Sequence, residues 1–386
     1  MGWENMQWLV RISFLLSGLI LFAGEGWADS LQQNFSGRAS EEYVTNPLLN
    51  PVLQGLSAWR STVDPNYMLT NVSGADQLKA DIDMLLIHSS NTSIIADGGF
   101  PTATMAWTHQ GDKSKFDVTT SYNVASTMMA MPSTTGLVSA NSTSTTRNLS
   151  AVWNRELSER TTLTLNGAYT YTNFSGSGNN TGLTDFVVQT SGVKVNYVLN
   201  EHSATFINLS YVDFVPTGGV PGSRIYNSLL GLTWSASERL DWILQAGPSR
   251  LESTSSGAGN TSTTTSTTSL QGGMTMNYKG QTSSLVLNAN RQSTPSGLGT
   301  IILTEQISGS LSYDLSERNK TGLDLGWSKY DELTVSFFRT ASIWLHHDLN
   351  TSWGLKAYVN HNTSVWGGFN PATSNMIGLS IAYTNF

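Results

Sequence analysis

Apolar and polar residues alternate regularly along the segment from Arg147 to Phe174. Every second residue from Leu149 to Trp153 is apolar, and the stretch from Leu163 to Tyr171 repeats the alternation. A period of two marks a β-strand whose two faces meet different surroundings. The polar stretch from Leu157 to Arg160 separates the two arms and predicts a hairpin.

The two faces of this hairpin differ in chemistry. One face is aliphatic with aromatic residues near the strand ends, and the other carries small, uncharged polar residues. A soluble sheet buries its apolar face in a core, whereas a transmembrane barrel turns that face to lipid and its polar face to a wet lumen. The rest of the sequence shows which of these two arrangements applies.

The same alternation recurs from Gln77 to the end of the chain. Short connections such as Tyr278–Gln281 alternate with long polar ones such as Ser175–Thr184 and Leu251–Thr268. We therefore predict an all-β fold, a transmembrane antiparallel up-and-down β-barrel of about 16 strands (14–18), with short periplasmic turns and long extracellular loops.

Aromatic residues gather at both ends of the predicted strands, as expected of the two girdles of a barrel in a bilayer. Those beside short turns are Trp107, Trp153, Tyr197, Trp234, Trp242, Tyr278, Tyr313 and Trp353, and those near long loops are Tyr122, Tyr169, Tyr171, Tyr211, Tyr226 and Trp327. A soluble sandwich gives no reason for this sorting, which supports the membrane barrel.

The first 74 residues differ from this pattern. Residues 1–28 resemble a secretory signal peptide, with an apolar run from Phe14 to Ala23 and the small-x-small sequence Gly26-Trp27-Ala28. Residues 29–74 contain three X-Pro dipeptides, which disfavour long strands, and an apolar patch between Leu48 and Trp59. We expect a periplasmic lead-in, with a lumenal plug or an extra strand as alternatives, and place the barrel at residues 75–386.

Composition narrows the functional classes. The chain has no cysteine, so it has no disulfide and no thiolate site. Only 12% of its residues are charged, the net charge is −7, and no basic stripe is present, which excludes nucleic acid as an expected partner. The expected partners are outer-membrane lipid and the barrel-assembly machinery.

The predicted polar face supplies the candidate functional residues. Ion selectivity normally needs a ring of like charges, and this face carries mostly neutral amides and hydroxyls, which suit hydrated neutral solutes such as sugars. The lumen-lining candidates are Lys79, Asp81, Asp83, Asp117, Asn154, Asn166, Lys194, Asn196, Asn208, Asn277, Asn288, Asp324, Lys356 and Asn360.

The sequence contains few residue clusters or motifs that are typical of enzymes. The only histidine cluster is His346-His347-Asp348, beside a predicted periplasmic turn, and a solvated interfacial position explains it better than a catalytic or metal site. Phosphate-binding, dinucleotide and zinc motifs are absent. We therefore expect no enzyme, no catalytic residues, no metal and no cofactor.

From Pro65 onward the chain resembles the β-barrel porins encoded with exopolysaccharide and PEP-CTERM protein-sorting systems. The resemblance is carried by Pro65-Asn-Tyr-Met-Leu-Thr-Asn71 and by the Ser-Glu-Arg turns that begin at Ser158, Ser237 and Ser316. It implies a barrel in the cell outer membrane that takes part in polysaccharide export, with polysaccharide and periplasmic export components as partners. The functional hypothesis is an outer-membrane channel, the exit pore for an exopolysaccharide. A general diffusion porin for small solutes and a surface-interaction or adhesion barrel are the alternatives.

Overall fold

The computed structural model describes residues 30–49, 55–127, 142–176, 183–256, 262–331, 336–366 and 370–385. Within these ranges the chain forms a single sheet of 18 strands, each paired with its neighbours in sequence. The strands are β1 (Ser30–Thr45), β2 (Ser57–Ser73), β3 (Asp76–Ser89), β4 (Gly98–Gln110), β5 (Ser114–Ser126), β6 (Ser142–Ser158), β7 (Thr161–Gly176), β8 (Phe186–Asn200), β9 (Ser203–Pro216), β10 (Ser223–Ser237), β11 (Leu240–Ser256), β12 (Ser262–Lys279), β13 (Ser283–Pro295), β14 (Ile301–Asp314), β15 (Asn319–Asp331), β16 (Ser336–Asp348), β17 (Trp353–Trp366) and β18 (Ala372–Thr384).

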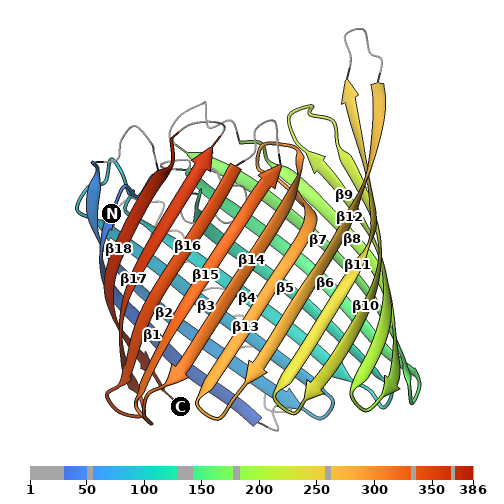
Figure 1. Cartoon of the computed structure of the whole chain (residues 1–386), viewed down its shortest axis with the longest axis horizontal. Coiled ribbons are helices and arrows are strands. Elements are labelled where there is room, and N and C mark those ends of the chain that lie inside the picture. The colour runs from blue at the N-terminus through green and yellow to red at the C-terminus, as the bar shows by residue number, and fades with distance from the viewer. Residues whose placement is uncertain are drawn as a thin grey trace.

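The sheet closes on itself because β1 pairs with both β2 and β18. The closing ladder is antiparallel and runs from Ser36–Thr384 to Val44–Met376. Figure 1 shows the tilted strands around the barrel, with the short turns and the end of β18 at the lower rim. Closure leaves no sheet edge exposed, which a barrel needs if it is to lie in lipid.

For residues 29–74 the expected periplasmic lead-in is wrong, and the alternative of an extra strand is nearer to the structure. Instead of a periplasmic lead-in or a lumenal plug, this segment contributes β1 and β2 to the wall, so the barrel begins at Ser30 and has 18 strands rather than about sixteen. The stretch from Pro65 to Asn71 lies inside β2, and not before the first strand. The β2–β3 ladder stops at Val63 and resumes at Asn66, on either side of Pro65, which has no N–H to donate. The signal peptide falls outside the described residues and stays a prediction.

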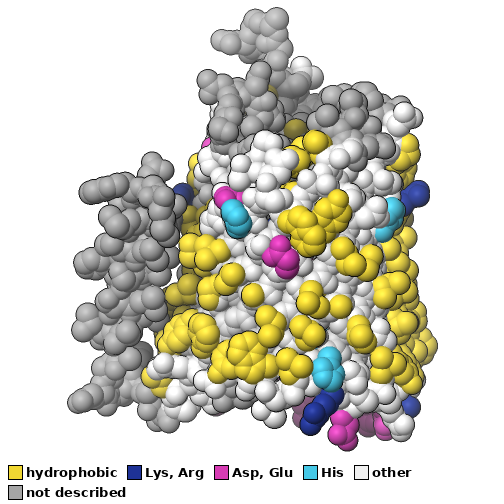
Figure 2. All heavy atoms as spheres, turned by 90° about the vertical axis from the view of Figure 1, so that its left-hand side faces the viewer, with side chains coloured by type: hydrophobic (Ala, Val, Ile, Leu, Met, Phe, Trp, Pro, Cys, Tyr) yellow, Lys and Arg dark blue, Asp and Glu magenta, His cyan; other side chains and the backbone are white. Residues whose placement is uncertain are grey.

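The outer face of the barrel is apolar. Large side chains such as Leu230 (62% exposed) and Ile343 (63% exposed) alternate along the strands with residues of the opposite face. All of the predicted girdle aromatics lie on this outer face, toward the ends of their strands. Figure 2 shows hydrophobic side chains spread over one side of the barrel, with few charged side chains among them. An apolar exterior around a polar interior is the arrangement of a transmembrane β-barrel.

Among the residues that the structure describes, no helix is long and apolar enough to cross a membrane.

The repeated Ser-Glu-Arg sequences have a local structural cause. In each of these turns the serine hydroxyl accepts a hydrogen bond from the arginine N–H two residues later, at 3.3, 3.3 and 3.4 Å for Ser158–Arg160, Ser237–Arg239 and Ser316–Arg318. Such a bond mimics a backbone turn and favours serine at this place. The motif therefore reports hairpin geometry and carries no chemistry of its own.

Candidate functional site: the lumen of the barrel

The predicted lumen-lining residues lie on the face opposite the exposed apolar one. They are Lys79, Asp81 and Asp83 on β3, Asp117 on β5, Asn154 on β6, Asn166 on β7, Lys194 and Asn196 on β8, Asn208 on β9, Asn277 on β12, Asn288 on β13, Asp324 on β15, and Lys356 and Asn360 on β17. That these side chains contact a passing solute remains a prediction. Charged and neutral side chains are unevenly distributed around the inner wall, and this is the main feature of the lumen.

One sector of the inner wall, formed by β1 to β5, concentrates charge in pairs. Arg38 contacts Asp64 at 3.0 Å, and Lys115 contacts Asp117 at 2.9 Å. Asp81 accepts a hydrogen bond from an amide of β2. Asp64 and Asp117 are thus paired with cations, whereas among the described residues Asp81 and its neighbour Asp83 form no ion pair, so the sector carries mostly paired charges and no ring of one sign.

The most buried of these pairs joins the ends of the chain. Glu42 on β1, only 6% exposed, forms an ion pair with Arg60 on β2 and accepts a hydrogen bond from the Tyr358 hydroxyl on β17. The Tyr358 side chain reaches Glu42 across Gly378 of β18, where a Cβ would lie 2.5 Å from the ring. The contact therefore links three strands at the closure. Sequence reasoning missed Glu42, Arg60, Arg38 and Asp64, because it did not assign β1 and β2 to the wall.

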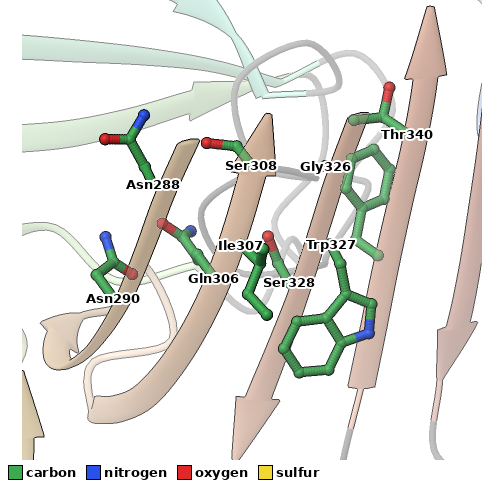
Figure 3. A pocket seen from close by; sticks show the side chains of 10 residues that line it. Asn288, Asn290, Gln306, Ile307, Ser308, Gly326, Trp327, Ser328 and Thr340 are labelled. Carbon is green, nitrogen blue, oxygen red and sulfur yellow. The ribbon is translucent and has the colours of Figure 1, made fainter. Parts of the chain in front are cut away.

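On β13 to β16 the inner wall is mainly uncharged, with Asp324 on β15 as its carboxylate near the middle of the strands. A recess of about 260 Å³ lies there near the middle of the strands, and Figure 3 shows the amides of Asn288, Asn290 and Gln306 side by side on β13 and β14. The rest of the lining combines the hydroxyl groups of Ser308, Ser328 and Thr340 with Ile307, Gly326, Trp327 and Phe338. Amides and hydroxyls both donate and accept hydrogen bonds, so this wall can exchange them with the hydration shell of a neutral polar solute.

Flat aromatic rings with a cation above them mark two further places on the inner face. The Lys194 ammonium lies 4.0 Å from the Phe206 ring centroid, and the Lys356 ammonium lies 4.9 Å from that of Trp344. Trp344 also donates its indole N–H to Asp324 at 2.9 Å. It lies against Gly322, where a Cβ would come within 2.3 Å of the ring, so glycine is required for this close approach. The two lysines are thus held against the wall by ring faces.

The connection between β3 and β4 folds into the extracellular mouth. Ile94 and Ile95, 3% and 2% exposed, pack against Ala58, Ile87 and Phe100. The last three lie on the inner face of β2, β3 and β4, so the connection lies inside the wall. Leu48 and Leu56 pack against the same cluster. Part of the apolar patch that suggested a plug therefore does reach the lumen, while Trp59 points outward with 52% of its surface exposed.

Asp97 holds the end of this connection to β3. Its carboxylate accepts the backbone N–H of Ser89 at 2.7 Å and faces the Nδ1 atom of His88 at 2.8 Å. The Ser89 hydrogen bond, and then the His88 ring, hold the pKa of Asp97 below its ordinary value of 3.8, because both favour the charged form. The tether is therefore intact across the physiological pH range.

The two histidines of the His346-His347-Asp348 cluster point to opposite faces of the barrel, because neighbouring residues of a strand alternate between its faces. His346 faces the lumen and contacts Asp348 at 2.9 Å, whereas His347 faces outward and contacts Asn319 at 2.8 Å. Within the described ranges, no group of three or more His, Asp or Glu side chains is arranged to hold a metal ion.

No protein-family model matches the chain, and no curated protein sequence is similar to it. Solved structures are similar in fold. The crystal structure of OpdK with vanillate, from Pseudomonas aeruginosa, is 10% identical with a TM-score of 0.51, covering 93% of this chain and 100% of OpdK. OpdO from the same organism is 11% identical with a TM-score of 0.51, covering 93% and 98%. A BenF-like porin from Pseudomonas fluorescens Pf-5 is 10% identical with a TM-score of 0.50, covering 93% and 100%.

These similarities concern the fold, and they agree with the apolar exterior and the polar interior. At identities of 10–11% they identify none of the side chains of the lumen. The protein is a closed transmembrane β-barrel with the fold of these outer-membrane proteins, located in the cell outer membrane.

Proposed function

We propose that the protein is an outer-membrane channel for small polar solutes that carry little net charge. The observation that carries this proposal is the division of the lumen into a sector in which most charges are paired and a sector with an amide-lined recess that has no charged residue in its lining. Barrels of about 16 to 18 strands enclose an aqueous channel. A solute in this lumen meets mainly neutral hydrogen-bonding groups on one side and mostly paired charges on the other.

The same features argue against strong ionic selectivity. A selective ion channel concentrates one sign of charge at its narrow part, whereas Arg38 and Lys115 each lie beside a carboxylate. The similar solved structures include porins, and one of them, OpdK, was crystallised with vanillate. Passage of an aromatic carboxylate of that kind is a secondary hypothesis here, because the recess lined by Asn290 and Gln306 has no cationic side chain in its lining.

Liposome swelling tests the proposal. Purified protein in liposomes is exposed to a neutral sugar, an acidic sugar and an amino sugar of similar size, and the swelling rates are compared. We expect the neutral sugar to enter fastest. The double variant Asn290→Asp/Gln306→Glu should slow the acidic sugar more than Asn208→Asp does, since the latter adds negative charge elsewhere on the inner face. Equal rates for all solutes and variants would refute a role for the recess.

Export of an exopolysaccharide is a narrower version of the channel hypothesis. It depends on the stretch from Pro65 to Asn71 and on the Ser-Glu-Arg turns, and both have local structural explanations in this barrel. No comparison supports that cargo. Deleting the gene and measuring the polysaccharide on the cell surface would separate the hypotheses, because a solute channel leaves its amount unchanged.

A further inference from the structure

Charged residues on the outer face occur at the two ends of the strands. On β6 to β16, the outward Arg, Lys, Asp and Glu side chains toward the extracellular rim are Arg147, Asp213, Arg224, Arg250, Glu252, Arg291, Glu305, Lys329, Asp331 and Arg339. At the periplasmic end of the same strands, Arg155 faces outward. The outward residues between these ends are uncharged, as a lipid-facing band requires.

The extracellular set has an excess of cations. It contains six Arg or Lys side chains and four carboxylates, in a chain whose net charge is −7. These residues lie at the level of the upper aromatic girdle, where Tyr226 is paired with Arg250 and Trp327 with Arg339. That level is the boundary between acyl chains and headgroups. Long cationic side chains at this depth can reach headgroup phosphates while their stems cover apolar surface.

Three of the six cations lie on β13 to β16. Arg291 and Lys329 lie on either side of Glu305, at 3.4 and 3.8 Å, and Lys329 also contacts Asp331 at 3.6 Å. These distances are those of loose surface pairs, which are weak and readily exchanged. Arg339, the next cation along the wall, is exposed, and none of the described carboxylates forms an ion pair with it. Two carboxylates, Glu305 and Asp331, beside three cations leave a net positive charge available to an anion.

We propose that this group, Arg291, Lys329 and Arg339 around Glu305, is a binding site for a phosphorylated glycolipid of the outer leaflet. Guanidinium groups match phosphate oxygens in paired hydrogen bonds. The ring pair Trp327–Phe337, with centroids 6.1 Å apart, lies beside the cations and offers an apolar surface to the lipid below the headgroup. The positive charge of this group and its position at the level of the lipid headgroups together favour a membrane lipid as the ligand. This site is independent of what passes through the lumen.

The experiment compares the full-length protein with Arg291→Gln/Lys329→Gln/Arg339→Gln and with the single variant Arg339→Gln. Each is purified in detergent and titrated with bisphosphorylated lipid A, with dephosphorylated lipid A, and with inorganic phosphate alone, and binding is followed by native mass spectrometry. Arg155→Gln, which removes an outward cation at the other end of the barrel, is the matched control. Heat-dependent migration in gels verifies that each variant is folded.

We expect wild type and Arg155→Gln to bind bisphosphorylated lipid A more tightly than the dephosphorylated form. Arg339→Gln should weaken this binding about fivefold and the triple variant ~100-fold, from about 1 kcal/mol for each cation near an anionic lipid surface. Inorganic phosphate alone should not compete at millimolar concentration. Equal binding of the two lipids, undiminished binding by the folded variants, or full competition by inorganic phosphate would each overturn the proposal.

Discussion

The inward-folded connection between β3 and β4 is expected to limit conductance. Ile95 is 2% exposed and packs in the apolar cluster inside the extracellular mouth. Truncating such an isoleucine to alanine removes buried methyl groups and leaves a cavity, which costs about 2–5 kcal/mol. If the whole free-energy loss weakens the packing of the β3–β4 connection against the wall, the ratio of molecules with a detached connection to those with an attached one rises about 30- to 4000-fold. Ile95→Ala should therefore raise the mean single-channel conductance in planar bilayers and add fluctuations to the open level.

The control makes the same chemical change on the lipid side. Ile307→Ala removes the same atoms from an outward side chain that is 56% exposed, so it leaves the mouth intact. Both variants must show the heat-dependent gel shift of a folded barrel before their conductance is compared. An unchanged conductance and noise for folded Ile95→Ala would show that this cluster does not restrict the path.

Three further predictions follow from the wall and its connections. Leu165→Arg, on the lipid face, should cost about 2–4 kcal/mol in a refolding titration, whereas Asn166→Arg on the inner face should be tolerated, and equal losses would mean that the two faces are exchanged. An epitope inserted after Gly218, in the β9–β10 connection, should be labelled on intact cells, and one after Lys279 should not, so the reverse pattern would invert the topology. The pKa of Asp97 is lower in the folded protein than its ordinary value of 3.8. The contacts of its carboxylate with Ser89 and His88 therefore stabilise the folded connection above pH 3.8, and this stabilisation is lost only as the pH falls through the lowered pKa. Conductance should therefore be constant between pH 7 and pH 4. A change within that interval would contradict the claim that Asp97 holds the β3–β4 connection in place.

Much of the wall could be predicted from the sequence because lipid and water impose a strict alternation on each strand. The strands from β3 to β18, and the inward position of residues such as Asn166 and Lys356, follow from that alternation alone. The first hairpin could not be predicted in the same way. Its outward positions include Gln33 and Glu41, so the apolar period is weak, and Pro65 occupies the middle of β2 where a strand ordinarily needs its N–H.

The organisation of the lumen depends on which strands become neighbours. The contact of Glu42 with Tyr358 joins residues from opposite ends of the chain, and it exists only because β1 closes against β18. Likewise, the sequence around Ile94 and Ile95 looks like an ordinary extracellular connection, and nothing local shows that it turns inward. The signal that could have found it is the inward apolar set Ile87 and Phe100, which is unusual on a wet face.

The central claim, a channel without strong charge selectivity, is tested most directly by a reversal potential. The protein is inserted in a planar bilayer between potassium chloride solutions that differ tenfold in concentration, and the voltage of zero current is measured. We predict a conducting pore whose reversal potential lies close to zero, because most charges on β1 to β5 are paired and the recess on β13 to β16 has no charged residue in its lining. Absence of conductance, or a reversal potential approaching the limit of about 59 mV for a perfectly selective pore, would contradict it.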